Sequence, residues 1–199
     1  MSLDKLVVKD VLSAEGLMKI NVLLGKNGAG KSRYLRSIEQ AFLRDELYRI
    51  RYISPERGGV FKRDGSVMAN IENSTGWLED SRRKNQVSQF KAASASLLRD
   101  IETIYLRKLQ DDVSIRDNHS KNFRNDRLNK INGLISNLIL IQDGSNFVFQ
   151  NHEGETIQPD QISSGESEAV ALAVEIMYFF ENLENEKLNI LLIDEPDVH

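Results

Sequence analysis

The sequence predicts an α/β fold in which helices flank a mostly parallel sheet, with an antiparallel β segment at the N-terminus and a helical insertion. Two observations lead to this prediction. Short aliphatic strand patterns alternate with amphipathic helical patterns, and the nearly continuous aliphatic run at 188–193 suits a strand buried on both faces of a parallel sheet. We expect an N-terminal lobe at 1–58, a loop and helical-hairpin insertion at 59–145, and a second part of the core at 146–199.

The composition bounds the classes of protein that this chain can belong to. With 199 residues, 40% of them hydrophobic, the chain can bury one core of ordinary domain size. A net charge of -4 gives no domain-wide basic field for a polyanion, and zero cysteines exclude disulfides, thiolate metal sites and cysteine nucleophiles. We find neither a secretory signal nor a membrane-spanning run, and therefore expect a cytoplasmic protein without a membrane partner.

The elements near the N-terminus follow from short hydrophobic patterns. We expect two strands at 5–11 and 18–24, joined by a turn at 14–16, because β-branched and aliphatic residues recur there in short runs. Helical spacing then predicts a helix over 31–48, followed by a strand at 49–53. Together they form a strand, loop, helix and strand unit.

The rest of the chain begins with a polar stretch at 56–85, which predicts a surface excursion with one short helix. In the later segments, apolar residues at three- to four-residue spacing predict helices. Alternating apolar and polar residues, or a continuous aliphatic run, predict strands. The predicted elements are amphipathic helices at 86–109 and 128–141 joined by a polar connection at 111–125, a strand at 146–150, a helix at 166–183 and a strand at 188–193.

The strongest chemical signal lies between the strand pattern at 18–24 and the helix pattern at 31–48. The segment Gly25 to Ser32 satisfies the phosphate-binding pattern G-x-x-x-x-G-K-[ST] in full. Its glycines let the backbone wrap phosphates, Lys31 reaches the β- and γ-phosphates, and the Ser32 hydroxyl ligates Mg²⁺. The candidate ATP-binding residues are therefore Gly25, Lys26, Asn27, Gly28, Ala29, Gly30, Lys31, Ser32 and Arg33.

Two adjacent acids follow the aliphatic run at 188–193. At the carboxyl end of a parallel strand, Asp194 can hold Mg²⁺ through its water shell, and Glu195 can orient or deprotonate the attacking water. A hydrophobic strand that ends in Asp-Glu is common by itself, so the phosphate-binding pattern gives this pair its weight. We expect Lys31 and Glu195 to be catalytic, and Ser32 and Asp194 to bind the metal.

A third segment, Ile162-Ser163-Ser164-Gly165-Glu166, directly precedes a helical pattern and at its simplest is an N-cap. It stands about two dozen residues before the acidic strand end, which is where ABC-type ATPases carry their Leu-Ser-Gly-Gly-Gln signature. The chain therefore resembles an ABC-class P-loop ATPase head, in particular the AAA-family proteins related to the overcoming-lysogenisation-defect (OLD) proteins and to RecF. The resemblance implies that Ser163 and Gly165, which match the signature, contact ATP bound to the opposite subunit of a homodimer. Ser164 and Glu166, which replace a glycine and the glutamine of the signature, belong to the same ATP-binding segment.

Several features depart from that family. The transporter branch stacks adenine on an aromatic residue upstream of the phosphate loop, but no aromatic residue precedes Tyr34 here. No glutamine follows the strand at 49–53, where Glu56 stands as a substitute. The family's next strand and its switch histidine would follow Glu195 at a distance that His199 does not reach, so we expect a fragment of a longer protein.

These observations predict an ATP-binding and ATP-hydrolysing head that dimerises on ATP and drives a change in an attached effector, such as a C-terminal nuclease domain, or in DNA. The resemblance suggests DNA repair or anti-phage defence. A non-hydrolysing, ATP-dependent scaffold or sensor is the alternative, and a transporter subunit is less favoured. The basic residues that could contact DNA are better explained as a solvated surface. They are Arg82, Arg83, Lys84, Lys121, Arg124, Arg127 and Lys130.

Overall fold

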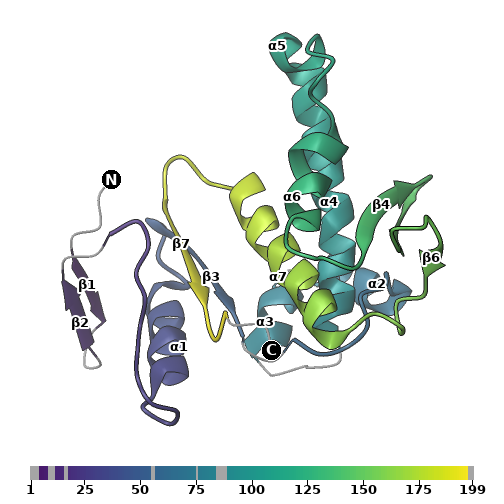
Figure 1. Cartoon of the computed structure of the whole chain (residues 1–199). Helices are drawn as coiled ribbons and strands as arrows, with labels where there is room; N and C mark the ends of the chain where they lie inside the picture. Colours follow the sequence, from purple (N-terminus) through teal and green to yellow (C-terminus); the bar gives the residue numbers. More distant parts are fainter. Residues whose placement is uncertain are drawn as a thin grey trace. The chain divides into compact units, whose positions relative to one another are not determined.

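The protein has an α/β fold, and the described part of the chain forms one small parallel sheet and two antiparallel sheets (Figure 1). Two compact units make up the chain, and they are described separately: Met1–Pro55 with Leu183–Pro196, called the first unit, and Glu56–Asn182 with Asp197–His199, called the second unit. The computed structural model describes residues 5–8, 12–15, 18–54, 57–74, 76–83 and 89–196.

The parallel sheet of the first unit consists of β3 (Tyr48–Ile53) and β7 (Leu188–Ile193). They pair from Tyr48 opposite Leu188 to Ile53 opposite Ile193, which confirms the two strands predicted at 49–53 and 188–193. Burial of β7 on both faces was a wrong prediction. All six of its residues are half-buried, because β3 is its one strand neighbour in the described part of the chain.

Helix α1 (Lys31–Phe42) packs against β3, with Ile38 at the centre of a small core. The helix ends earlier than the predicted limit of residue 48. Asp45 explains the difference, because its side chain accepts a hydrogen bond from the Leu47 amide at 2.9 Å and forms a turn that competes with further helix. The apolar residues around Ile38 are Tyr34, Phe42, Ile50, Ile190 and Leu192.

At the N-terminus, β1 (Lys5–Val8) pairs antiparallel with β2 (Leu12–Glu15). The predicted turn at 14–16 is therefore wrong, since residues 14 and 15 belong to β2. Apolar alternation marks strand character but does not fix where the chain reverses, which explains the misplaced turn.

The strand predicted at 18–24 is also absent from the described structure. Met18 and Asn21 instead bond each other through two local hydrogen bonds of 2.9 and 2.7 Å. A strand needs a neighbour for its backbone groups, and β3 and β7 pair with each other rather than with this segment. Large apolar side chains are consequently exposed here, namely Met18, Ile20, Val22, Leu23 and Leu24.

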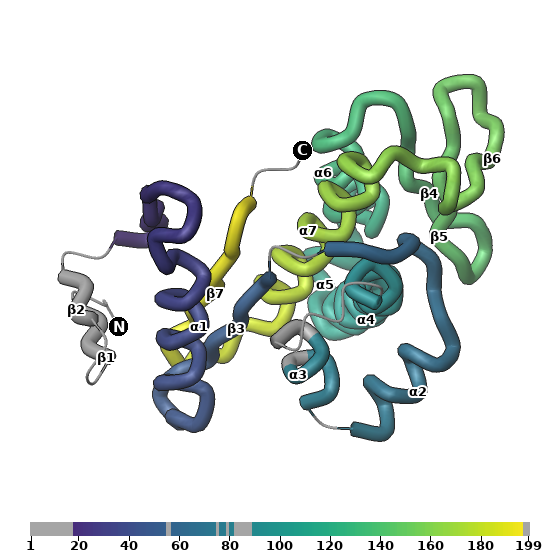
Figure 2. The backbone as a smooth tube through the Cα atoms, turned by 90° about the horizontal axis from the view of Figure 1, so that it is seen from below, coloured from purple at the N-terminus to yellow at the C-terminus, as the bar shows by residue number. Residues whose placement is uncertain are grey.

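The second unit is built around α4 (Phe90–Asp111) and α7 (Ser164–Glu181), which lie side by side in both views of the chain (Figures 1 and 2). Both helices were predicted, within a few residues at each end. Two short helices, α2 (Gly65–Asn73) and α3 (Trp77–Arg83), occupy the predicted polar excursion, where one was expected. Side chains with at most 1% exposure at the heart of this unit include Leu97, Leu98, Ile101, Leu128, Ile131, Val170 and Val174.

The helix predicted over 128–141 is wrong. The chain forms the π-helical turn η2 (Arg124–Leu128) and the short helix α6 (Asn129–Asn132), and then enters the strand β4 (Ile139–Asp143). Gly144, with a φ of 55°, turns β4 back into β5 (Asn146–Gln150), which confirms the predicted strand 146–150. The remaining elements are α5 (Val113–Arg116) and β6 (Thr156–Ile157), which pairs with β5.

Residues 146–182 cluster with 56–145 in the second unit, whereas the sequence grouped them with the core of the first. Their assignment to one ATPase core remains a prediction. In the described part of the chain, no helix has both the length and the apolar character needed to cross a bilayer.

Candidate functional site

The glycine-rich loop before α1 has the backbone that its sequence requires. Gly28 and Gly30 have φ values of 80° and 90°, in the left-handed region where a side chain is unfavourable. The Ala29 amide donates to the Lys26 carbonyl at 3.1 Å, and the Tyr34 amide donates to the Gly30 carbonyl at 2.9 Å as α1 begins. The backbone amide groups at the start of α1 therefore come directly after the loop, and free amides at a helix N-terminus favour the binding of anions.

Lys31 folds back over this loop. Its Nζ donates to the carbonyl oxygens of Gly25 at 2.8 Å and of Lys26 at 3.2 Å. These are bonds between a charged donor and neutral acceptors, and a phosphate oxygen is a stronger acceptor for the same ammonium. Ser32 is half-buried in the first turn of α1, whereas Asn27 and Arg33 are exposed.

The two acids after β7 lie at the carboxyl end of the parallel sheet. The Asp194 amide continues the ladder by donating to the Ile53 carbonyl at 3.0 Å, and Asp194 is only 2% exposed. Glu195 is exposed and has a φ of 48°, the one positive φ of a non-glycine residue in the described structure. Residues held in this region cluster at functional sites, so the strain supports a role for Glu195.

Two residues beside Asp194 were not identified from the sequence. The Tyr52 hydroxyl donates to Asp194 Oδ2 at 2.8 Å, and Arg36 Nε donates to the same hydroxyl at 3.4 Å. Burial of the ring raises the pKa of Tyr52 to about 12, so the hydroxyl keeps its proton at any physiological pH. Aligning the ends of 49–53 and 188–193 as neighbouring strands would have placed Tyr52 near Asp194.

The oxygen donors of the first unit fit Mg²⁺. A serine hydroxyl at the helix start and a carboxylate at a strand end are hard ligands of the kind this cation prefers. The described residues contain no cluster of three or more His, Asp or Glu side chains that could hold a metal. A cation bound by Ser32 and Asp194 would therefore take its other ligands from water and phosphate, as Mg²⁺ does in nucleotide sites.

The segment 163–166 begins α7 in the second unit. Ser163 caps the helix, with its Oγ accepting from the Glu166 amide at 3.2 Å and donating to the Glu166 carboxylate at 2.7 Å. The N-cap that the sequence predicts for this segment is therefore confirmed. Ser163 and Ser164 are exposed, while Gly165 and Glu166 are half-buried.

Two residues that the sequence did not single out hold the start of α7. Lys91 of α4 is 4% exposed, and its Nζ donates to Ser167 Oγ at 2.7 Å and lies 3.8 Å from the Glu168 carboxylate. Burial lowers the pKa of Lys91. The Asn137 amide groups donate to Glu166 Oε1 at 3.3 and 3.1 Å. A buried lysine within an amphipathic helix gives no sequence signal of its own.

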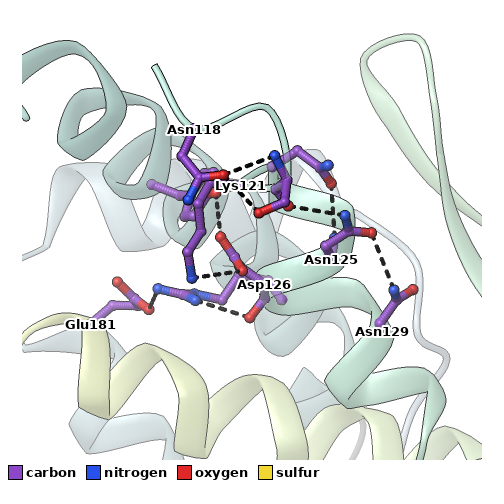
Figure 3. Close-up of polar contacts among 10 residues, drawn as sticks. Asn118, Lys121, Asn125, Asp126, Asn129 and Glu181 are labelled. Atoms are coloured by element: carbon purple, nitrogen blue, oxygen red, sulfur yellow. Dashed lines mark hydrogen bonds and ion pairs between the residues drawn. The ribbon is translucent and has the colours of Figure 1, made fainter. Parts of the chain in front are cut away.

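The last turn of α7 is held by a charged cluster (Figure 3). Glu181 pairs with Lys108 at 2.7 Å and with Arg127 at 2.5 Å. Nearby, Asp126 accepts from the Tyr105 hydroxyl at 2.6 Å. Arg127 was predicted to be solvated, but its side chain is only 18% exposed because the carboxylate of Glu181 gives it a partner.

The structure thus brings Lys31, Ser32, Asp194 and Glu195 into the first unit and 163–166 into the second. Four other predictions concern residues or side chains that the structure does not describe. They are Glu56 as a substitute for the family's glutamine, the solvated basic run 82–84, His199 as too early for the switch histidine, and the start of a helix at 86.

Comparisons with protein-family models, curated proteins and solved structures found no match. The chemistry of the loop 25–32, of the acids at 194–195 and of the segment 163–166 therefore has to indicate the function.

Proposed function

We propose that this protein is an ABC-class ATPase head that binds Mg²⁺-ATP at the loop 25–32 and hydrolyses it. One observation carries the proposal: a glycine loop with two left-handed glycines leads into α1, with Lys31 folded over its carbonyl groups, while the same unit ends its parallel sheet in Asp194 and Glu195. Each feature is common alone, but their combination suits phosphoryl transfer.

The chemistry of the first unit assigns a role to each group. Lys31 exchanges its carbonyl partners for β- and γ-phosphate oxygens and stabilises the negative charge that develops on the transferring phosphoryl group. Ser32 and Asp194 hold Mg²⁺, which neutralises phosphate charge when bound. Glu195 orients a water molecule and takes its proton, while the water oxygen attacks the γ-phosphorus, the bond to the β-γ bridging oxygen breaks and ADP leaves with that oxygen.

The second unit contributes the segment 163–166, which in this proposal contacts ATP bound to a partner copy. Exposed hydroxyl groups at the start of α7 suit an approaching anion. ATP then closes two heads, hydrolysis releases them, and an attached effector protein or DNA in the cytoplasm responds.

The Glu195→Gln variant tests turnover. Glutamine keeps the size of the side chain but cannot act as a base, so we expect phosphate release to fall at least about a hundredfold while ATP binding persists. Glu186→Gln is the matched control, because Glu186 is an exposed acid of the same unit outside the site. Equal turnover by parent and Glu195→Gln contradicts the assigned role, and a parent that binds ATP without turnover identifies the scaffold alternative.

Light scattering after size exclusion tests the dimer. With Mg²⁺-ATP we expect Glu195→Gln to accumulate at twice the monomer mass, because it binds ATP but does not hydrolyse it. Ser163→Arg places a bulky cation at the start of α7 and should remain monomeric with ATP while still binding it. A Ser163→Arg variant that dimerises like Glu195→Gln excludes the role of this segment in trans.

A further inference from the structure

Asp194 cannot hold its orientation without a partner. Its side chain is 2% exposed at the end of β7, and a buried carboxylate is costly unless donors satisfy it. Tyr52 of β3 supplies one donor, since its hydroxyl lies 2.8 Å from Asp194 Oδ2. The Tyr52 side chain is itself fixed, because the residue is only 1% exposed in the core of the first unit.

The direction of that hydrogen bond is set by Arg36. The Arg36 Nε donates to the Tyr52 hydroxyl oxygen at 3.4 Å, and its guanidinium carbon lies 5.8 Å from the centre of the Tyr52 ring. A hydroxyl has one proton, so an oxygen that accepts from Arg36 points its own proton toward Asp194.

Helix α1 connects this chain of contacts to the loop. Arg36 follows Ser32 by four residues, which places both on one face of α1. The helix that carries the Ser32 hydroxyl therefore also carries the group that orients Tyr52, and Tyr52 contacts Asp194. The two residues proposed to hold Mg²⁺ are thus linked through α1, Arg36 and Tyr52.

We propose that Tyr52 is a positioning residue for Mg²⁺: its hydroxyl holds the Asp194 carboxylate in the orientation that binds the cation. The inference rests on the proposed nucleotide site. Partners of metal-binding carboxylates commonly set metal affinity, and their removal weakens it by about tenfold or more. Tyr52 does not touch nucleotide in this role, so it affects the metal requirement and not the binding of ATP itself.

The variants Tyr52→Phe and Tyr48→Phe test this role. Tyr52→Phe removes the hydroxyl and keeps the ring. Tyr48→Phe is the matched control, because Tyr48 lies on the same face of β3 and packs on Phe42 with ring centres 4.5 Å apart, away from Asp194. Binding of a fluorescent ATP analogue is measured first in EDTA and then against increasing Mg²⁺.

In EDTA we expect the same affinity for parent, Tyr52→Phe and Tyr48→Phe, within about twofold. With Mg²⁺, Tyr52→Phe should need about tenfold more cation for the half-maximal gain in affinity, whereas Tyr48→Phe should match the parent. An unchanged Mg²⁺ requirement in Tyr52→Phe overturns the role of Tyr52 and leaves the nucleotide site intact. A parent that binds no nucleotide under either condition refutes the proposed function, and this role with it.

If Tyr52→Phe fails to fold, a second measurement tests the same role in the parent. The parent is labelled with 3-fluorotyrosine at its five tyrosines, and the Tyr52 signal is assigned by elimination with phenylalanine variants of the other four. In the ATP-bound parent, Mg²⁺ should shift the fluorine resonance of Tyr52 and leave that of Tyr48 in place. A Tyr52 resonance that does not respond to Mg²⁺ overturns the inference.

Discussion

Removal of the carboxylate charge of Glu181 should loosen the last turn of α7, the helix that begins with the proposed contact segment. Glu181 is the shared partner of Arg127 at 2.5 Å and of Lys108 at 2.7 Å. Its side chain is 7% exposed, against 18% for Arg127 and 49% for Lys108. Glu181→Gln keeps the size of the side chain and removes its charge.

The magnitude follows from these exposures. Breaking a fully buried ion pair costs about 3–5 kcal/mol, and breaking an exposed one costs about 0.2–1 kcal/mol. The Arg127 pair lies between these limits and the Lys108 pair near the lower one, so we expect Glu181→Gln to lower the free energy of unfolding by about 2 kcal/mol. With a urea dependence of about 2 kcal/mol per M, the midpoint should fall by about 1 M.

Tryptophan fluorescence in urea is the assay, since Trp77 is the only tryptophan of the chain and belongs to the second unit. The control is Asp117→Asn, which removes an exposed ion pair with Arg116 in the same unit and should change the free energy of unfolding by at most about 0.5 kcal/mol. If Glu181→Gln shifts the urea midpoint no more than this control does, the ion pairs of Glu181 do not stabilise the second unit and the reasoning is refuted.

Three further predictions concern the second unit. Glu166→Gln keeps the cap of α7 but removes a negative charge from the segment proposed to meet phosphate, so ATP-dependent dimers should form at lower protein concentration in light scattering; weaker dimers contradict this. Tyr105→Phe should resist alkali better than the parent: burial raises the Tyr105 pKa to about 12 from 10.0, so its stabilising contribution is present below pH 10 and is lost as pH rises toward 12. Circular dichroism between pH 10 and 12 measures the folded fraction, and a parent that stays folded to higher pH than Tyr105→Phe contradicts this reasoning. Leu98→Ala, at a side chain of α4 with 0% exposure, should lower the free energy of unfolding in urea by about 3 kcal/mol, and a loss below about 1 kcal/mol contradicts tight packing at this position.

The sequence predicted elements whose patterns are long or chemically distinct. The strands at 49–53, 146–150 and 188–193 were predicted to within one residue, because β-branched and aromatic residues or a continuous aliphatic run identify them. Helix α4 was predicted because its apolar spacing persists over several turns.

The errors come from short segments in which local chemistry outweighs periodicity. Apolar residues at 128–141 fit helical spacing, yet Gly144 and Ser145 form a tight turn that pairs 139–143 with 146–150. Likewise, the side chain of Asp45 ends α1 early. Both signals were present in the sequence, as the Gly144-Ser145 pair between two apolar segments and as an Asp after an apolar helix.

For the candidate site, prediction from the sequence is limited in a different way. The loop 25–32 and the pair at 194–195 follow recognisable spacings, so they could be identified from residues alone. The contact between Tyr52 and Asp194 joins positions 142 residues apart and depends on the register of β3 against β7. The pattern of one strand does not encode that register, so the contact could be predicted only by also aligning the carboxyl ends of the two strands as neighbours.

Calorimetric titration of Mg²⁺-ATP into the parent, Lys31→Ala and Lys19→Ala tests the central claim most directly. Lys19 is the matched control, because it is an exposed lysine of the first unit outside the loop. We expect the parent and Lys19→Ala to bind with equal affinity and Lys31→Ala to bind at least about tenfold more weakly, since a charge-assisted bond to phosphate is worth about 1.5–3 kcal/mol. Binding that is equal in all three proteins, or absent from the parent, would contradict a nucleotide site at this loop.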